Sequence, residues 1–159
     1  MYEYIHAPKT FYRVEDASSC ARRIKGAGIV ALRKTKYTWN DDATVRLVKD
    51  HLDWRSRKRS PFISVYDTLE RAQYEARRRV RHNSSDVVIW EIKTTSRGKR
   101  RRGRKDWPRA EYRNLTKYAE KRGFDIPKVA LNMSEHEWLF LRSIPECMIV
   151  RRRRISLGS

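Results

Sequence analysis

The chain has 159 residues, of which 39% are hydrophobic and 36% are charged, and its formal net charge is +19. No apolar run reaches the roughly 20 residues that a membrane-spanning helix needs, and no apolar leader opens the sequence, so we expect neither a membrane protein nor a secreted one. Two cysteines, Cys20 and Cys147, are too few for a disulfide framework or a structural zinc site, which favours an intracellular protein.

The first third of the chain predicts two strands and two helices. Residues 10–14, Thr-Phe-Tyr-Arg-Val, have the aromatic and β-branched composition of a strand. Residues 16–25 predict a helix, because they begin with side chains that can cap one and are followed by glycine. The apolar residues 29–32 predict a second strand, and Asp41 or Asp42 can begin a second helix.

The middle of the chain has the strongest local pattern. Residues 62–66, Phe-Ile-Ser-Val-Tyr, have strand composition. Asp67 and Glu70 have the spacing of a capping box, so we expect a helix from there to about residue 79. Residues 86–93 predict a buried strand because they are mostly β-branched, aromatic or aliphatic.

The last third predicts one helix and two strands. A helix is expected over residues 107–122, since a proline lies near its first turn and a glycine follows it. Apolar segments at 137–141 and 147–150 predict the last strands. We therefore expect one mixed α and β domain over residues 1–150, with about six strands and four helices, and a basic tail over 151–159.

Positive charge is concentrated in two runs. Residues 97–105 carry seven basic side chains and no apolar one, so we expect a loop, and residues 151–154 are four arginines. Such runs are typical of nuclear targeting and of nucleic-acid binding, and charge alone does not separate the two. The residues that we expect to contact nucleic acid are Lys99, Arg100, Arg101, Arg102, Arg104, Lys105, Trp107, Arg151 and Arg152.

Three predicted strand segments each carry polar residues that chemistry can use. Arg13 follows two aromatic residues, Ser64 lies inside an apolar strand, and Glu135 and Glu137 immediately precede Trp-Leu-Phe-Leu. A charge or hydroxyl in a buried strand is costly unless a partner compensates it. In one cleft, the guanidinium can hold a phosphate, the hydroxyl can orient a ligand, and a carboxylate can stabilise a developing positive charge.

In the order and context of these motifs, the sequence resembles the ADP-ribosyltransferase superfamily, in the branch with Arg, Ser and (Gln/Glu)-x-Glu motifs. The matching segments are Phe-Tyr-Arg13-Val, Phe-Ile-Ser64-Val-Tyr and Glu135-His-Glu137-Trp-Leu-Phe-Leu. The second motif of the family usually continues Ser-Thr-Ser, whereas Val65 and Tyr66 follow Ser64 here. The combination of motifs resembles an uncharacterised fungal group of ADP-ribosyltransferase-like domains. The resemblance implies an α+β fold with a split sheet of about six strands and flanking helices.

The resemblance also implies roles for the motif residues. Arg13 would bind a phosphate of NAD, and Ser64 would hydrogen-bond near the nicotinamide ribose. Glu137 would stabilise the oxocarbenium-like state, and Glu135 would orient or activate the nucleophile. Among the neighbouring aromatic residues, those expected to help bind NAD are Tyr12 and Tyr66.

We therefore expect an intracellular, nuclear mono-ADP-ribosyltransferase that uses NAD and no metal. Its acceptor would be an acidic macromolecule, with DNA ranked before RNA because of the basic runs. The alternatives are an NAD glycohydrolase, with water as the acceptor, and a non-catalytic nucleic-acid-binding module of the same fold.

Overall fold

The strands form two antiparallel sheets. The computed structural model describes residues 7–53, 58–96 and 109–155. One sheet has the strand order β6-β7-β4-β1-β5-β9 and the other has the order β2-β3-β8. The strands span Thr10–Glu15 (β1), Arg22–Ile24 (β2), Gly28–Val30 (β3), Phe62–Tyr66 (β4), Val88–Lys93 (β5), Glu111–Asn114 (β6), Glu137–Leu141 (β7), Ser143–Ile144 (β8) and Ile149–Arg154 (β9).

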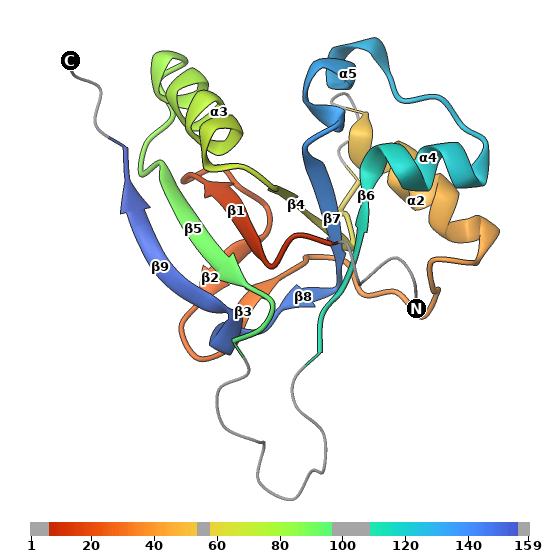
Figure 1. Cartoon of the computed structure of the whole chain (residues 1–159), viewed down its shortest axis with the longest axis horizontal. Coiled ribbons are helices and arrows are strands. Elements are labelled where there is room, and N and C mark those ends of the chain that lie inside the picture. Colours follow the sequence, from red (N-terminus) through yellow and green to blue (C-terminus); the bar gives the residue numbers. More distant parts are fainter. Residues whose placement is uncertain (1–6, 54–57, 97–108, 156–159) are drawn as a thin grey trace, which may run out of the picture.

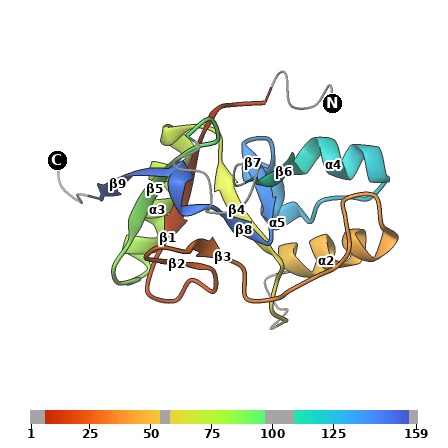
Figure 2. The same ribbon diagram turned by 90° about the horizontal axis from the view of Figure 1, so that it is seen from below.

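The helices lie at opposite ends of the six-stranded sheet. They span Asp42–Leu52 (α2), Leu69–Arg81 (α3), Leu115–Arg122 (α4) and Lys128–Ser134 (α5), with a short 3-10 helix at Glu146–Met148 (η1). Figures 1 and 2 show α3 beside β1, β5 and β9, whereas α2, α4 and α5 lie at the end that contains β6 and β7. The expected α+β class, with about six strands in the main sheet and flanking helices, is confirmed.

Three groups of apolar side chains hold this arrangement together. Phe11, Ile63, Phe140 and their neighbours lie on one face of the main sheet, against the small sheet. A second group joins α2 and α4 to β4 and β7. A third joins α3 to β1 and β5 through Ala72 and Ala76, which are fully buried. Small residues on α3 allow the helix to approach the sheet closely.

Several expected elements are observed with small differences in their ends. The strands predicted around Arg13, Ser64 and Glu137 are β1, β4 and β7. In α3, the N-cap is Thr68, whose hydroxyl accepts a hydrogen bond from the Arg71 backbone N–H at 3.2 Å. The helix therefore begins one residue later than the expected capping box implies.

The helix predicted over residues 16–25 is wrong. The Asp16 carboxylate accepts a hydrogen bond from the Ser18 backbone N–H at 2.7 Å, which stabilises a turn instead of a first helical turn. Residues 22–24 then pair with β3, and the Glu15 carboxylate accepts a hydrogen bond from the Arg23 backbone N–H at 2.6 Å. Side chain to backbone bonds and strand pairing therefore outweigh the local helix signals.

The helix predicted over residues 107–122 is correct only in its second half, which is α4. Residues 107 and 108 lie outside the described residues, and residues 111–114 form β6. This strand pairs with β7, and its Tyr112 ring stacks on Phe140 with ring centroids 4.9 Å apart. The edge of β7 offers backbone partners that no local pattern reveals.

The expected basic tail also differs from the structure, because residues 151–154 belong to β9. They continue the strand that begins at Ile149 and pair with β5 along its length. The arginines contact acidic and aromatic side chains on β5. Arg153 donates a hydrogen bond to Glu91 at 3.1 Å, and the Arg152 guanidinium lies 5.9 Å from the Trp90 ring centroid. These contacts and the backbone ladder offset the repulsion between neighbouring arginines.

Candidate active site

The three motif strands are neighbours in the sheet, in the order β7-β4-β1, and two of them separate beside Arg13. The β4–β7 ladder contains five residue pairs and the β1–β5 ladder contains six. Within the described residues, the β1–β4 ladder contains only the pair Tyr12 and Tyr66. Backbone groups on the facing sides of β1 and β4 are therefore left for side chains to satisfy.

Arg13 bridges this separation. One terminal nitrogen of its guanidinium donates to the Ser64 carbonyl oxygen at 2.9 Å, and the other donates to the Ala21 carbonyl oxygen at 3.0 Å. The side chain is only 8% exposed, and its buried Nε has no hydrogen-bond partner among the described residues. Burial, with Arg79 nearby, lowers the pKa of Arg13 to about 10, so the group is still cationic at neutral pH.

Ser64 lies in a chain of hydrogen bonds that begins on α2. The His51 ring contacts Ser60 Oγ through Nδ1 at 2.6 Å and Ser64 Oγ through Nε2 at 2.7 Å. The Ser64 hydroxyl also lies close enough to Glu137 to lower the pKa of that carboxyl by hydrogen bonding. Because an ionised carboxylate only accepts, Ser64 donates to Glu137 and Nε2–H of His51 donates to Ser64, which leaves Nδ1 to accept from Ser60.

The environment of His51 agrees with this assignment of protons. Burial and the positive charge of Arg13 lower the pKa of His51 to about 4, so the ring is neutral at physiological pH. Ser60 Oγ in turn accepts a hydrogen bond from the Phe62 backbone N–H at 3.0 Å. Each hydroxyl in the chain thus has both a donor and an acceptor role, and the Ser64 hydroxyl is held toward the carboxylate.

Glu137 lies at the start of β7, directly opposite Tyr66 of β4. Burial raises the pKa of Glu137, and the negative charge of Glu75 raises it further, whereas the Ser64 hydrogen bond and Arg13 lower it. Burial and the same two carboxylates raise the pKa of the Tyr66 phenol. The carboxylate of Glu137 is therefore in a poorly solvated environment, where its charge acts strongly on any group that comes close.

The loop before Glu137 is anchored on both sides. Asp67 accepts a hydrogen bond from Trp138 Nε1 at 3.2 Å and contacts His136 Nδ1 at 2.9 Å, and its backbone N–H donates to the His136 carbonyl oxygen at 3.0 Å. Glu135 is exposed, and its carbonyl oxygen accepts a hydrogen bond from Asn114 Nδ2 at 3.3 Å. Asp67 thus fixes the residues on either side of Glu137, while the Glu135 side chain faces solvent.

Basic side chains of α3 extend the site beyond Arg13. Arg79 donates to Glu75 at 3.0 Å and to Asp16 at 3.2 Å, and Arg78 donates to both carboxylate oxygens of Glu75. A cavity of about 360 Å³ lies here, and its lining includes Arg13, Arg78 and Arg79 together with several serines. Guanidinium and hydroxyl donors around one cavity are suited to phosphate oxygens.

The structure brings some of the expected site residues together and separates others. Arg13, Ser64 and Glu137 form a connected group, with Tyr66 beside Glu137 and Tyr12 opposite Tyr66. Residues 97–108, which include most of the residues expected to bind nucleic acid, lie outside the described residues. Arg151 and Arg152 lie on β9, and three strands of the sheet separate β9 from β7.

Three further residues belong to the site although their sequence context did not predict it: His51, Asp67 and Glu75. His51 is four residues after Leu47 and three after Val48, so it shares the buried face of α2. A polar residue on an otherwise apolar helical face was the available signal. Asp67 had been interpreted as a cap, and nothing local indicated that its carboxylate contacts side chains of β7.

The described residues contain neither a metal site nor a membrane-spanning helix. No group of three or more His, Cys, Asp or Glu side chains in this part of the chain is arranged to hold a metal ion. No helix in the same part combines the length and the apolar character needed to cross a membrane.

Comparisons with known proteins identify the family of this chain. The family model described as "Domain of unknown function (DUF7587)" matches residues 6–158. No curated protein matches the chain. Among solved structures, the chain is similar to one named EcPltA, with 15% sequence identity, a TM-score of 0.49, and coverage of 92% of this chain and 75% of that chain.

Proposed function

We propose that this chain, which belongs to the family described as a domain of unknown function, DUF7587, is an NAD-dependent mono-ADP-ribosyltransferase. One observation carries the proposal: Arg13 donates to the Ser64 backbone carbonyl, and the Ser64 hydroxyl lies close enough to Glu137 to lower its pKa by hydrogen bonding. Three motif residues from remote parts of the sequence thus form one connected group, in the order that the resemblance to ADP-ribosyltransferases requires.

Glu137 supplies the group that the reaction needs most. When the N-glycosidic bond of NAD breaks, positive charge develops on the ribose as nicotinamide leaves. A fixed carboxylate in a poorly solvated site stabilises that charge more than it stabilises the neutral ribose of the ground state. The Ser64 hydroxyl, itself oriented by His51, holds the carboxylate in position and favours its ionised form.

The phosphates of NAD would lie on the basic side of the site. Arg13 has a buried Nε without a partner among the described residues, and Arg78 and Arg79 line the adjacent cavity. These donors match the charge and hydrogen-bonding capacity of a pyrophosphate. Tyr66 and Tyr12 would form the wall beside the ribose and nicotinamide.

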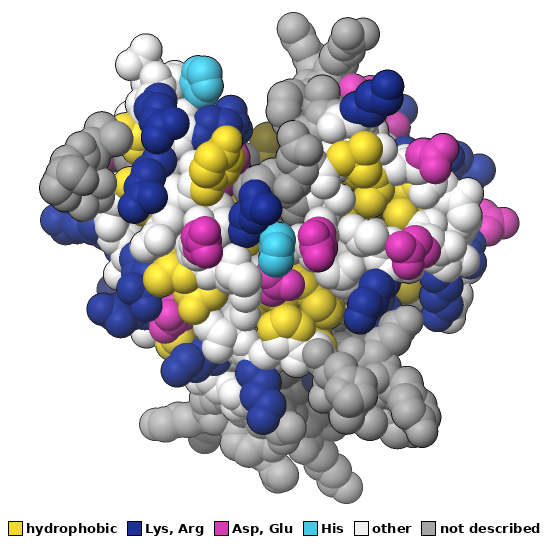
Figure 3. Space-filling model, turned by 45° about the horizontal axis from the view of Figure 1, so that its top comes forward, with side chains coloured by type: hydrophobic (Ala, Val, Ile, Leu, Met, Phe, Trp, Pro, Cys, Tyr) yellow, Lys and Arg dark blue, Asp and Glu magenta, His cyan; other side chains and the backbone are white. Residues whose placement is uncertain are grey.

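The acceptor would approach from the side of Glu135, whose exposed carboxylate can orient or activate a nucleophile. We rank DNA first as the acceptor, RNA second, and the nucleus as the location. The support is the net charge of +19, with Lys and Arg side chains spread over the face in Figure 3. A polyanion can contact a basic edge such as β9 while one of its nucleotides lies near Glu137.

The test is to incubate the protein with labelled NAD, with and without DNA, and to measure nicotinamide release and transfer of label. Glu137→Gln keeps the shape of the side chain and should reduce nicotinamide release by about 100-fold or more. Glu120→Gln, which changes an exposed glutamate on α4, is the matched control and should not alter it. Urea unfolding of each variant checks that the fold is retained.

The outcomes separate the alternatives. Nicotinamide release without transfer to any acceptor would identify an NAD glycohydrolase. Nucleic-acid binding with steep salt dependence, no NAD consumption and indifference to Glu137→Gln would identify a non-catalytic module and refute the proposal.

A further inference from the structure

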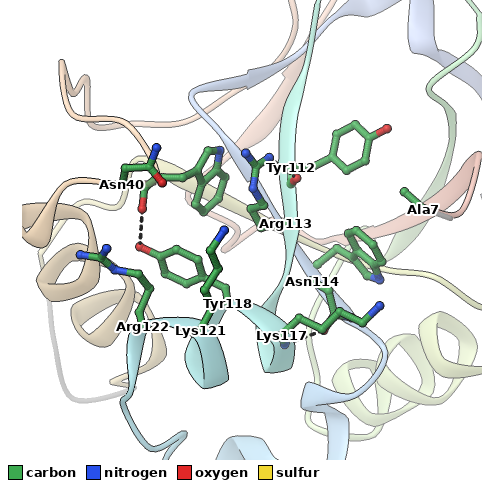
Figure 4. Close-up of a pocket in the computed structure, with 11 residues that line it drawn as sticks. Ala7, Asn40, Tyr112, Arg113, Asn114, Lys117, Tyr118, Lys121 and Arg122 are labelled. Carbon is green, nitrogen blue, oxygen red and sulfur yellow. Dashed lines mark hydrogen bonds between the residues drawn. The ribbon is translucent and has the colours of Figure 1, made fainter. Parts of the chain in front are cut away.

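A second cavity lies at the β6 edge of the sheet, away from the basic cavity beside Arg13. It has a volume of about 80 Å³, and its lining comes from β6, α4, the segment before α2, β7 and the N-terminal segment. The eleven residues drawn in Figure 4 are these lining residues, and they lie on both sides of β6. Because strand residues alternate, Tyr112 and Asn114 face one side of β6 and Arg113 faces the other.

The lining of this cavity is basic. Arg113, Lys117, Lys121 and Arg122 are among the lining residues, and no acidic side chain is among those that the structure describes. Arg122 also donates to Asp42 at 2.6 Å, outside the lining. Lys117 and Lys121 are exposed on successive turns of α4, so they point to the same side of the helix. The cavity therefore favours an anionic ligand.

Aromatic side chains line the cavity on both sides of β6, and one of them has a donor without a partner among the described residues. Trp39, Tyr112, Tyr118 and Trp138 all contribute to the lining. Trp39 is 5% exposed, and its buried Nε1 has no hydrogen-bond partner among the described residues. The Arg113 guanidinium lies 5.3 Å from the Trp39 ring centroid and Nε1 is covered, so the indole must turn before an acceptor on a ligand can satisfy this N–H.

The same cavity adjoins the loop that carries the glutamates. Asn114 lines the cavity, and its side-chain amide donates to the Glu135 carbonyl oxygen at 3.3 Å. Trp138, which follows Glu137 in β7, lines it as well and lies opposite Asn114 in the ladder. A ligand held there would lie beside the loop that contains Glu135 rather than the cavity beside Arg13.

We propose that this cavity binds one nucleotide of a single-stranded nucleic acid, with the base toward Trp39 and the phosphates toward Lys117 and Lys121. A nucleotide has three properties that complement the lining of the cavity: negative charge, a flat ring, and hydrogen-bond acceptors on that ring. The volume is that of roughly six waters, which suits one base ring but not a stacked pair. A base must be unpaired to enter, so a single strand fits and an intact duplex does not.

This inference deepens the proposed function, since it identifies the site where the acceptor would be held. The binding step itself is independent of catalysis. It can therefore be tested even if the protein consumes no NAD.

The experiment measures binding of a short fluorescent oligodeoxythymidine by anisotropy at several salt concentrations. The double variant Lys117→Glu/Lys121→Glu should weaken binding by about tenfold or more at low salt. The uncharging variant Lys117→Gln/Lys121→Gln should reduce the slope of log affinity against log salt by about 1.4, or 0.7 per lost phosphate contact. The control Lys25→Glu/Lys34→Glu makes the same change of charge on exposed lysines outside the lining and should have a much smaller effect.

Trp39→Phe tests the base contact separately. It keeps an aromatic ring but removes Nε1–H, and it should weaken oligonucleotide binding by about two- to tenfold with no change in the salt slope. Circular dichroism and urea unfolding confirm that the variant is folded.

Two further arms identify the source of the nucleotide. Competition of thymidine monophosphate with the oligonucleotide would support a site for a single nucleotide. Failure of thymidine monophosphate to compete at saturating concentration would refute the proposed site. If the lysine variants weaken NAD binding instead of oligonucleotide binding, the cavity belongs to the NAD site and the inference is wrong. Equal weakening by the Lys25→Glu/Lys34→Glu control would also overturn it, because binding would then depend on overall charge alone.

Discussion

The hydrogen bond between Ser64 and Glu137 can be tested by replacing Ser64 with alanine. The substitution removes the hydroxyl that donates to the carboxylate and that receives the His51 Nε2–H at 2.7 Å. A hydrogen bond to a charged group contributes about 1.5–3 kcal/mol. If the bond acts fully on the transition state, kcat/KM for NAD consumption should fall by about 10- to 150-fold at neutral pH.

The same substitution should also change the pH dependence. The hydroxyl stabilises the ionised form of Glu137 and so lowers its pKa, and the loss of the hydroxyl must raise that pKa. Because the ionised carboxylate is the active form, activity is lost as the pH falls through the pKa of Glu137. The acid limb of the pH profile should therefore lie at higher pH in Ser64→Ala than in the unmodified protein.

The assay is nicotinamide release measured from acid to neutral pH, with Ser60→Ala as the control. Ser60→Ala removes the contact with His51 Nδ1 but leaves the bond between Ser64 and Glu137, so it should reduce activity less and should not move the acid limb. An acid limb that is unchanged in Ser64→Ala, or that moves equally in both variants, would refute this reasoning about the carboxylate.

Three other predictions concern stability and positioning. Burial and the charge of Arg13 lower the pKa of His51 to about 4 in the folded state. Between pH 6.5 and 4, His51 is therefore protonated in the unfolded chain but neutral in the folded protein. The free energy of unfolding should fall by up to about 3 kcal/mol as the pH drops from 6.5 to 4, and urea titrations should show a smaller fall in His51→Gln. Gly28→Ala should destabilise the protein by at least about 2 kcal/mol more than Gly26→Ala. Both glycines have positive φ, but only at Gly28 would an added Cβ collide with the Ile144 carbonyl oxygen. Urea unfolding of the two variants measures the difference. Asp67→Ala should lower kcat for NAD consumption, and Asp67→Asn, which keeps one acceptor for Trp138 Nε1, should recover part of it; equal kcat in both variants would contradict a positioning role.

Local sequence was enough to predict the elements that carry the motifs. Strand composition around Arg13, Ser64 and Glu137 identifies β1, β4 and β7, because β-branched and aromatic side chains suit a half-buried pleated surface. The helical periodicity and capping residues near Thr68 likewise indicate α3. These signals lie within a few residues of one another, so they can be recognised without knowledge of the rest of the chain.

Pairing between distant segments was not predictable in the same way. Part of the helix expected over residues 16–25 is instead strand β2, and part of the first half of the helix expected over residues 107–122 is strand β6. In both places, pairing with a free strand edge outweighs a weak helix preference. The arginines of β9 have the composition of a tail, yet they complete a ladder on β5.

For the candidate site, the sequence by itself determined which residue types are present and that Arg13, Ser64 and Glu137 lie on strands. Only the tertiary structure decided that β1 and β4 separate beside Arg13, and that His51 and Asp67 support Ser64 and the loop around Glu137. The physical reason is that the charge and proton state of a buried group depend on the atoms around it in space. Those atoms belong to segments far away in the sequence, and folding alone brings them together.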